Sequence, residues 1–238
     1  MLGLKTSSKG SKRDEAEKPF WISFSDLMTA LMVLFLVAMA VALLSVTQGL
    51  RDIKAKEEER AKSVESCMTD VQGVTSTFPG VVIREHSIDF GTLANFGNNS
   101  SDLSPIQQAF LREFVPSVLA VATQPVCQRW LKRIVVEGFA SQSGTYLHNL
   151  DLSTKRSERV LCALLDARAD NPIDESERQL IQSLFLVGGY SSNSIRKTPE
   201  ESRRIELKLE FYDLKDPKEP EPPPIPLDQS SFCPISAQ

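Results

Sequence analysis

The chain has 238 residues and a formal net charge of −4, from 27 Lys and Arg residues against 31 Asp and Glu residues. This balance gives no basic field of the kind that attracts nucleic acid, so we expect no nucleic-acid partner. The length suffices for one globular domain of ordinary size with further segments at its ends.

The N-terminal part predicts a membrane anchor. Residues 1–19 are polar and charged and are expected to form a flexible cytoplasmic tail. Residues 20–46 predict a single transmembrane helix, because Thr29 and Ser45 are the only polar residues between Leu27 and Val46. About 20 residues at 1.5 Å per residue span roughly 30 Å, the thickness of a bilayer core. This run is longer than the apolar region of a signal peptide, about 7–15 residues, so we predict that it is not cleaved.

A carboxylate, Asp26, lies one turn inside this apolar helix. One interpretation is a charge at the membrane interface that is favourable to the helix dipole. The other is a buried, protonatable group with a raised pKa, since a charge at the centre of a span costs about 2.5–3.5 kcal/mol. A single span cannot shield a charge from lipid, so the second interpretation requires partner helices. The hydroxyls of Ser23, Ser25 and Thr29 either line the ion path or simply bond to backbone carbonyls.

The distribution of charge does not decide the orientation of the span. Five Lys and Arg residues precede it and five follow it closely, so the positive-inside rule gives a tie. The larger polar part of the chain follows the span, and long domains translocate largely regardless of charge. We therefore predict a single-pass inner-membrane protein with a cytoplasmic N-terminus and a periplasmic C-terminal domain.

The rest of the chain predicts a spacer, a domain and a tail. Residues 47–77 are rich in charge and in helix formers, as expected of a solvated helical spacer. Residues 78–213 alternate strand and helix patterns. Strands are expected at 81–85, within 88–99, and at 131–137, 184–187 and 204–212, and helices at 105–125 and 150–169. The proline-rich residues 214–238 are expected to be disordered.

Within this domain, Ser104 and Pro105 supply an N-cap and a first helical residue. The helix that follows should bury the apolar residues at helical spacing, which are Ile106, Phe110, Phe114, Val118 and Leu119. The last strand alternates apolar and charged residues, which predicts one buried and one solvated face.

Four cysteines, Cys67, Cys127, Cys162 and Cys233, would face an oxidising compartment. One or two disulfides in any pairing, or buried free thiols, fit this pattern equally well. No spacing of Cys and His indicates a metal site, so we expect no metal and no cofactor. We also find no pairing of nucleophile and base and no glycine-rich phosphate loop, and therefore expect no enzymatic activity.

The segment Phe24-Ser25-Asp26-Leu27-Met28-Thr29, with Trp21 upstream, resembles the membrane segment of the MotB family, the B-type subunits of bacterial ion-driven stators. The resemblance implies that Asp26 carries the transported ion, a proton or, as an open alternative, Na⁺. It also implies a homodimer of this chain inside a ring of five MotA-like membrane subunits, which turns as ions flow.

A second set of residues lies around residues 135–160. Helical spacing places Asn149, Leu152 and Arg156 along one side of a helix, where Arg156 could form two hydrogen bonds with a carboxylate. Alternatively, this is a solvated face with Lys155, Arg156, Glu158 and Arg159 all exposed. The spacing alone favours the solvated face.

The same stretch resembles the OmpA-like peptidoglycan-binding domain, through Val136-Glu137-Gly138, residues 149–156 and Ser202-Arg203-Arg204-Ile205-Glu206. The resemblance implies an α/β sandwich with a mixed sheet and helices on one face, and an Arg that holds a carboxylate of the wall peptide. The implied peptidoglycan contacts are Ser141, His148, Asn149, Leu152, Arg156 and Arg203. The family's Thr-Asp pair is replaced by Ala140-Ser141, which implies weaker or differently arranged wall binding.

Together these features predict a peptidoglycan-anchored subunit of an ion-driven rotary motor. The membrane segment and the proline-rich end look most like the MotB-like subunits of Zorya anti-phage defence systems. A flagellar stator subunit and a non-conducting tether between inner membrane and cell wall remain alternatives. An energy transducer of the ExbD/TolR type is disfavoured, because its exported domain lacks the Asn-x-x-Leu-Ser-x-x-Arg pattern.

Overall fold

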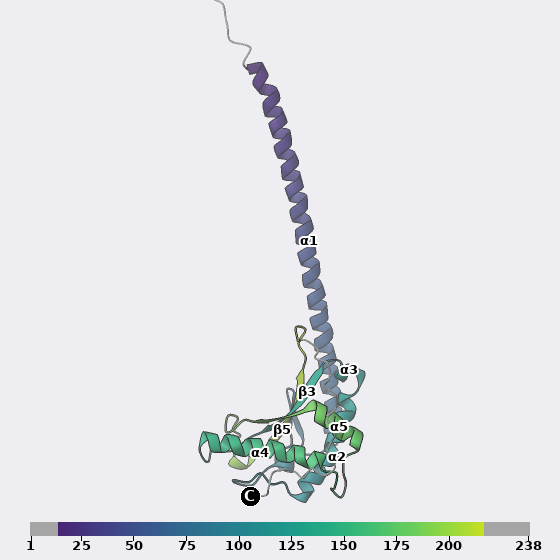
Figure 1. Ribbon diagram of the computed structural model, residues 1–238, viewed down its shortest axis with the longest axis vertical. Coiled ribbons are helices and arrows are strands. Elements are labelled where there is room, and N and C mark those ends of the chain that lie inside the picture. The colour runs from purple at the N-terminus through teal and green to yellow at the C-terminus, as the bar shows by residue number, and fades with distance from the viewer. Residues whose placement is uncertain (1–13, 217–238) are drawn as a thin grey trace, which may run out of the picture. The chain divides into compact units, whose positions relative to one another are not determined.

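The computed structural model describes the backbone of residues 14–216 and the side chains of Trp21 and residues 23–216 (Figure 1). The predicted tails, 1–19 and 214–238, lie mostly outside these residues. The chain divides into two units, and the boundary falls between Lys56 and Glu57, inside the first helix.

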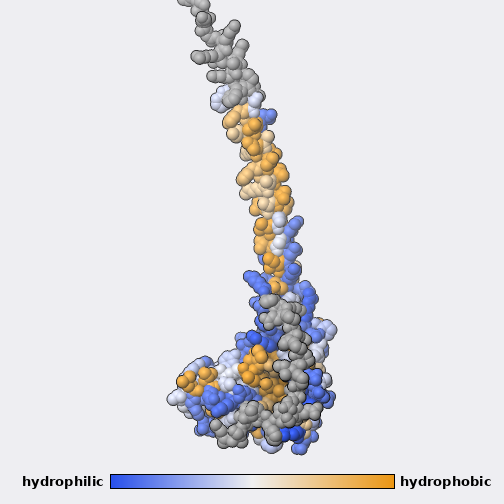
Figure 2. Space-filling model, in the orientation of Figure 1, coloured by the Kyte–Doolittle hydropathy of each residue, from blue (hydrophilic) through white to orange (hydrophobic). Residues whose placement is uncertain are grey.

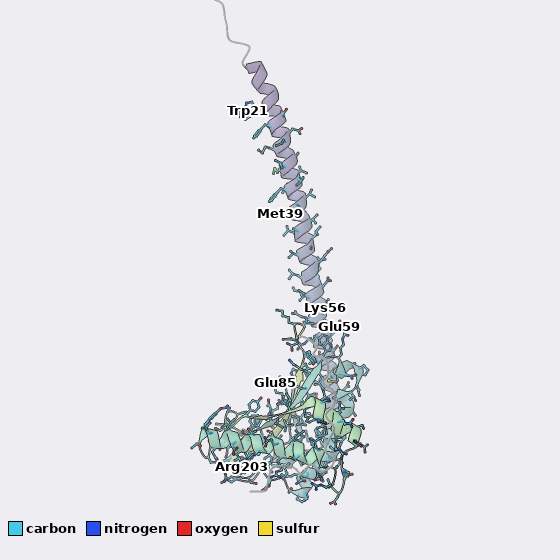
Figure 3. The ribbon with its side chains drawn as sticks, viewed as in Figure 1. Trp21, Met39, Lys56, Glu59, Glu85 and Arg203 are labelled. Carbon is cyan, nitrogen blue, oxygen red and sulfur yellow. A yellow bond between two sulfur atoms is a disulfide. The ribbon has the colours of Figure 1, made fainter. Side chains whose placement is uncertain are left out.

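The first unit contains the N-terminal part of helix α1 (Asp14–Thr75). The predicted span and spacer are one uninterrupted helix, which is long and apolar enough to cross a membrane by length and composition. Figure 2 shows the apolar residues as a continuous orange band along this helix. Every described side chain from Trp21 to Lys56 is exposed, and Trp21 and Met39 project away from the helix (Figure 3).

The second unit is built on a five-stranded sheet with the order β1-β2-β5-β3-β4. The strands are β1 (Val82–Arg84), β2 (Ser87–Asp89), β3 (Leu131–Gly138), β4 (Phe185–Gly189) and β5 (Ile205–Phe211). All neighbours are antiparallel except β3 and β4, which are parallel. The mixed sheet is therefore confirmed, with each strand close to its predicted position.

Helices connect these strands: η1 (Gly91–Ala94), α2 (Pro105–Ala122), α3 (Pro125–Gln128), α4 (Tyr146–Leu165), α5 (Glu175–Leu184) and α6 (Pro199–Ser202). Helix α4 begins and ends four residues before the prediction. It begins early because Thr145 caps its first turn by accepting a hydrogen bond from the His148 backbone N–H. Helix α5 was not predicted from the sequence.

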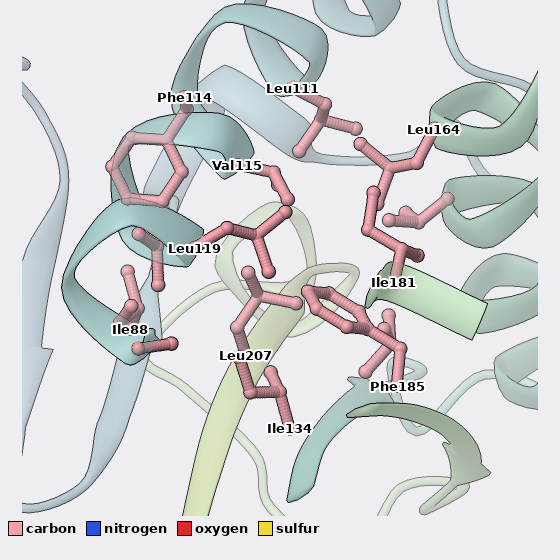
Figure 4. Close-up of a cluster of buried hydrophobic side chains, with 14 of the residues drawn as sticks. Ile88, Leu111, Phe114, Val115, Leu119, Ile134, Leu164, Ile181, Phe185 and Leu207 are labelled. Carbon is pink, nitrogen blue, oxygen red and sulfur yellow. The ribbon is translucent and has the colours of Figure 1, made fainter. Parts of the chain in front are cut away.

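The core lies between the helices and one face of the sheet (Figure 4). Register places Ile134 of β3 opposite Leu209 of β5, and Val136 opposite Leu207, and all four side chains are buried on the helix side. On the other face, Arg133 forms an ion pair with Glu210 at 2.6 Å. The alternation of side chains along strands thus confirms helices packed on one face.

Helix α2 begins as predicted. Ser104 and Gln107 form a reciprocal capping box, and Pro105 is the first helical residue. Phe114, Val118 and Leu119 are buried as expected, and Phe110 is partly buried. The prediction for Ile106 was wrong: its side chain is 82% exposed, because the first turn of α2 extends past the core.

The solvated face predicted for β5 also needs correction. Glu206 is buried rather than exposed, and its carboxylate accepts hydrogen bonds from Arg204 at 2.7 Å and from Arg196 at 2.9 Å. Arg196 also forms an ion pair with the buried Asp89. A buried carboxylate is tolerated here because the arginines compensate for its lost hydration.

The spacer prediction was wrong at its C-terminal end. Cys67 and Val71 of α1 are fully buried in the domain core, so the compact domain begins well before Phe78. A disulfide between Cys67 and Cys127 joins the end of α1 to α3. Cys162 is also disulfide-bonded, which contradicts the free-thiol alternative for all three described cysteines; Cys233 lies outside the described residues.

Candidate functional site

The carboxylate of the first unit, Asp26, is exposed on α1. The Thr29 hydroxyl donates to the Ser25 carbonyl at 2.7 Å, the local bond expected of a hydroxyl in a helix. Ser23 and Ser25 are exposed beside it. The described part of the first unit therefore contributes to this site one carboxylate, with three hydroxyl-bearing residues close to it along the chain.

The two sides of this helix differ in the size of their side chains. A shallow groove begins at Asp26 and continues over Thr29, Ala30, Val33, Leu34, Val37 and Ala38, of which only Leu34 is large. A rotation of about 100° per residue places the large side chains, those of Phe24, Met28, Met32, Phe35 and Met39, on the opposite side. Small side chains let another helix approach closely, so the Asp26 side is the one suited to helix packing.

In the second unit, all six predicted contact residues line one pocket of about 210 Å³. They are Ser141, His148, Asn149, Leu152, Arg156 and Arg203. Arg203, labelled in Figure 3, comes from the segment between α6 and β5. Four further residues complete the lining: Asn98, Asn99, Ser143 and Gly144. The sequence analysis missed these four, although the pair Asn98-Asn99 had been noted as part of a loop.

Two glycines allow α4 to bring its residues to this pocket. A Cβ atom at Gly138 would overlap the Ser153 carbonyl oxygen, and one at Gly189 would overlap the Thr154 hydroxyl. Because both strand ends lack side chains, α4 lies directly on them. The Ser157 hydroxyl fixes this contact by donating to the Gly188 carbonyl at 2.8 Å.

Arg156 is completely buried, so the alternative of a solvated helix face was wrong for this residue. Its guanidinium donates to three backbone carbonyls: Nε to Ser100 at 3.0 Å, Nη1 to Phe139 at 2.8 Å and Nη2 to Gly97 at 3.0 Å. A guanidinium has five N–H donors, so two remain. Arg156 therefore both holds the loop around residues 97–100 against β3 and lines the pocket.

The second arginine supports the same loop. Arg203 Nε donates to the Phe96 carbonyl at 3.0 Å, and the Arg203 carbonyl accepts from the Phe96 N–H at 2.9 Å. Burial, together with the nearby charge of Arg203, lowers the pKa of Arg156 from 12.5 to about 10. Arg156 remains positively charged at neutral pH, so the pocket has two cationic groups.

The remaining contacts order the polar side chains around the arginines. The Asn149 side-chain amide donates to the Ser141 carbonyl at 3.1 Å, and the Ser141 and Ser143 hydroxyls lie 2.9 Å apart. His148 Nε2 lies 2.7 Å from the Asn99 side-chain oxygen. Asn99 has φ 51°, a left-handed conformation that Asn tolerates. This arrangement is a donor-rich recess suited to a small anion.

Comparison with known proteins finds relatives that cover nearly the whole chain. Residues 5–48 match the family model described as membrane MotB of the proton-channel complex MotA/MotB. The Zorya protein ZorB of Escherichia coli O139:H28 is 41% identical over 227 residues, covering 92% of this chain and 91% of that protein. A second ZorB, from the E. coli Crooks strain, is 25% identical over 222 residues, covering 83% of this chain and 90% of that protein.

Solved structures are similar to the second unit at a lower level. The periplasmic domain of Helicobacter pylori MotB is 12% identical with a TM-score of 0.39, covering 57% of this chain and 83% of that one. The cell wall anchor of the T6SS from Pseudomonas aeruginosa is 15% identical with a TM-score of 0.38, covering 60% and 95%. Likenesses this low carry no inference about function. The identity to ZorB along nearly the entire length does, and the chain belongs to the ZorB family of Zorya proteins, as a MotB-type stator subunit.

Proposed function

We propose that this chain conducts protons through Asp26 and anchors an ion-driven motor to peptidoglycan through the pocket lined by Arg156 and Arg203, as part of Zorya anti-phage defence. The observation that carries the proposal is Asp26 itself, an exposed carboxylate on a helix long and apolar enough to span a bilayer. Membership of the ZorB family and the match of residues 5–48 to the MotB model support it.

A MotA-like subunit supplies the missing surroundings of Asp26 in this proposal. The carboxylate would be costly against lipid, and the described first unit supplies no shielding. Helices of a MotA-like ring would pack against the small residues beside it, with two copies of this chain inside five MotA-like subunits. Enclosed there, the carboxylate would be kept away from lipid and could take up a proton from one side of the membrane and pass it to the other. A proton needs no coordination cage, which favours it over Na⁺.

The orientation in this proposal places the second unit in the periplasm and the N-terminus in the cytoplasm of a cell with an inner membrane. The disulfide between Cys67 and Cys127 supports this, because disulfides persist in oxidising compartments such as the periplasm. Peptidoglycan is then within reach of the pocket. Anchoring lets the ring turn against a fixed partner, so the proposed activity is transport coupled to rotation, without covalent catalysis.

Replacement of the carboxylate tests ion conduction. Asp26→Asn keeps the shape of the side chain but cannot bind and release a proton, so cells that carry it together with the MotA-like partner should lose both proton uptake and phage protection. Asp52→Asn is the matched control, because Asp52 lies on the same helix beyond the apolar run. Retention of both activities by Asp26→Asn would show that Asp26 does not carry the proton, and phage protection without any proton uptake in the wild type would leave only the non-conducting tether.

A further inference from the structure

The charges around the pocket are unbalanced. Its ten lining residues include two arginines and no Asp or Glu. Among the described side chains, no carboxylate pairs with Arg156, and the only charge there that shifts its pKa is the like charge of Arg203. Arg203 does pair with Glu200 at 2.9 Å, but the Glu200 side chain is 63% exposed and does not line the pocket. The pocket is therefore positive without any internal acid.

The hydrogen-bonding groups of the pocket favour the same kind of ligand. Arg156 has two N–H donors left after its three carbonyl bonds, and Arg203 has three left after its bonds to Phe96 and Glu200. A carboxylate can accept several such charge-assisted bonds. An ammonium would instead face two positive charges and find only neutral oxygens of Asn and Ser residues.

The two kinds of carboxylate found on wall peptides differ in this respect. At the C-terminus of a peptide, the nitrogen next to the carboxylate is part of an amide and carries no charge. At the free end of a diamino acid, a carboxylate and an ammonium share one carbon. A site with arginines and no acid accommodates the C-terminal carboxylate of a peptide. The same site repels the ammonium of a zwitterionic end, so the repulsion between like charges gives the specificity.

We propose that this pocket recognises the C-terminal carboxylate of a peptide in preference to the zwitterionic end of an amino acid. The inference rests on the proposed wall-binding function and names the ligand class of that site. The volume of about 210 Å³ fits a terminal residue rather than a longer peptide. The side-chain amides of Asn98 and Asn99 lie in the lining, where they can bond to the peptide group next to the carboxylate.

Three small probes test the preference on the full chain in detergent micelles, with dissociation constants measured by NMR titration. N-acetyl-D-alanyl-D-alanine has the terminal carboxylate, its C-terminal amide has no charge, and meso-diaminopimelate has two zwitterionic ends. We expect the acetylated acid to bind at least tenfold more tightly than either of the others. Equal or tighter binding of meso-diaminopimelate overturns the inference.

Two substitutions identify the pocket as the site. Arg203→Gln should weaken binding of the acetylated acid at least tenfold, whereas Lys155→Gln should not change it, because Lys155 lies on α4 outside the lining. Ser141→Asp introduces an acid into the lining and should shift the preference toward meso-diaminopimelate by at least tenfold. If Ser141→Asp does not fold, the ratio of affinities in the wild-type chain still decides.

Sedimentation with purified sacculi separates this inference from the proposed function. If the wild-type chain sediments with sacculi but prefers meso-diaminopimelate, wall binding stands and the ligand preference is wrong. If the chain does not sediment with sacculi at all, the proposed anchoring fails. If Arg203→Gln leaves both sacculus binding and probe binding unchanged, the pocket is not the ligand site and the inference fails.

Discussion

Asp26 and Arg156 each lack a partner of opposite charge within the described chain, but their surroundings differ completely. Asp26 lies on a helix whose described side chains are all exposed as far as Lys56. Arg156 is fully buried, and three backbone carbonyls accept its hydrogen bonds. The domain thus satisfies most of the donors of Arg156 by itself, whereas Asp26 depends on other molecules for its environment. The charge of Arg156 is therefore part of the structure of the domain, whereas the charge of Asp26 is available to a partner in an assembly.

The comparison predicts that removing the charge of Asp26 affects function but not stability, whereas removing the charge of Arg156 lowers stability. The largest expected effect is the loss of function. Asp26→Asn should abolish phage protection while leaving the stability of the domain unchanged, because Asp26 is an exposed residue of the first unit. Urea unfolding followed by Trp130 fluorescence, in a Trp21→Phe background, measures that stability. A shift of the unfolding midpoint in Asp26→Asn would show that the helix carboxylate supports the fold.

The next largest effect is expected for Arg156→Ala. Removal of the guanidinium leaves three carbonyls without their charged donor, at about 1.5 kcal/mol each, so the free energy of unfolding should fall by about 4.5 kcal/mol. The same urea experiment measures it. Lys155→Ala, on the same helix, should change it by less than about 1 kcal/mol, since its ion pair with Asp151 is largely exposed. An undiminished stability of Arg156→Ala would mean that Arg156 serves binding alone.

A smaller loss of stability is expected when the disulfide of the domain is removed. The double variant Cys67→Ala and Cys127→Ala opens a covalent link across a sequence separation of 60 residues. It should lower the free energy of unfolding by about 2–4 kcal/mol, mainly because the unfolded chain gains freedom. Wild-type chain in reductant should lose at least as much stability, because reduction also opens the disulfide of Cys162. Phage protection by this variant at low temperature would show that the link stabilises the domain without taking part in ion conduction.

The smallest effect concerns pH. Burial and a hydrogen bond to Glu137 raise the pKa of Tyr190 from 10.0 to about 12. The folded state therefore holds this proton more tightly than the unfolded state, so the contribution of Tyr190 is complete below pH 10 and is lost as the pH rises towards 12. Absorbance titration of tyrosinate should show a late step that Tyr190→Phe removes. Persistence of that step would assign it to another tyrosine.

Much of the fold was predictable because local patterns agree with the tertiary structure. The capping box at Ser104 confirms the predicted start of α2, and Gly138 ends β3 where expected. Helical spacing and family resemblance predicted that the six residues act at one site, and all six line the same pocket. Ile106 and Glu206 were assigned to the wrong environment, because periodicity indicates a face of an element but not how far the core extends or which ion pairs cover it.

The sequence by itself determined an apolar helix with one carboxylate and an alternation of strands and helices, because these follow from periodicity, length and turn chemistry. The mixed sheet and the anion site were predicted from the family resemblance. Only the tertiary structure decided that Arg156 is buried, that Cys67 pairs with Cys127 and that α1 continues into the domain core. These features depend on contacts between segments far apart in the chain. Burial and disulfide pairing depend on such contacts, and the local sequence pattern of one segment does not determine them.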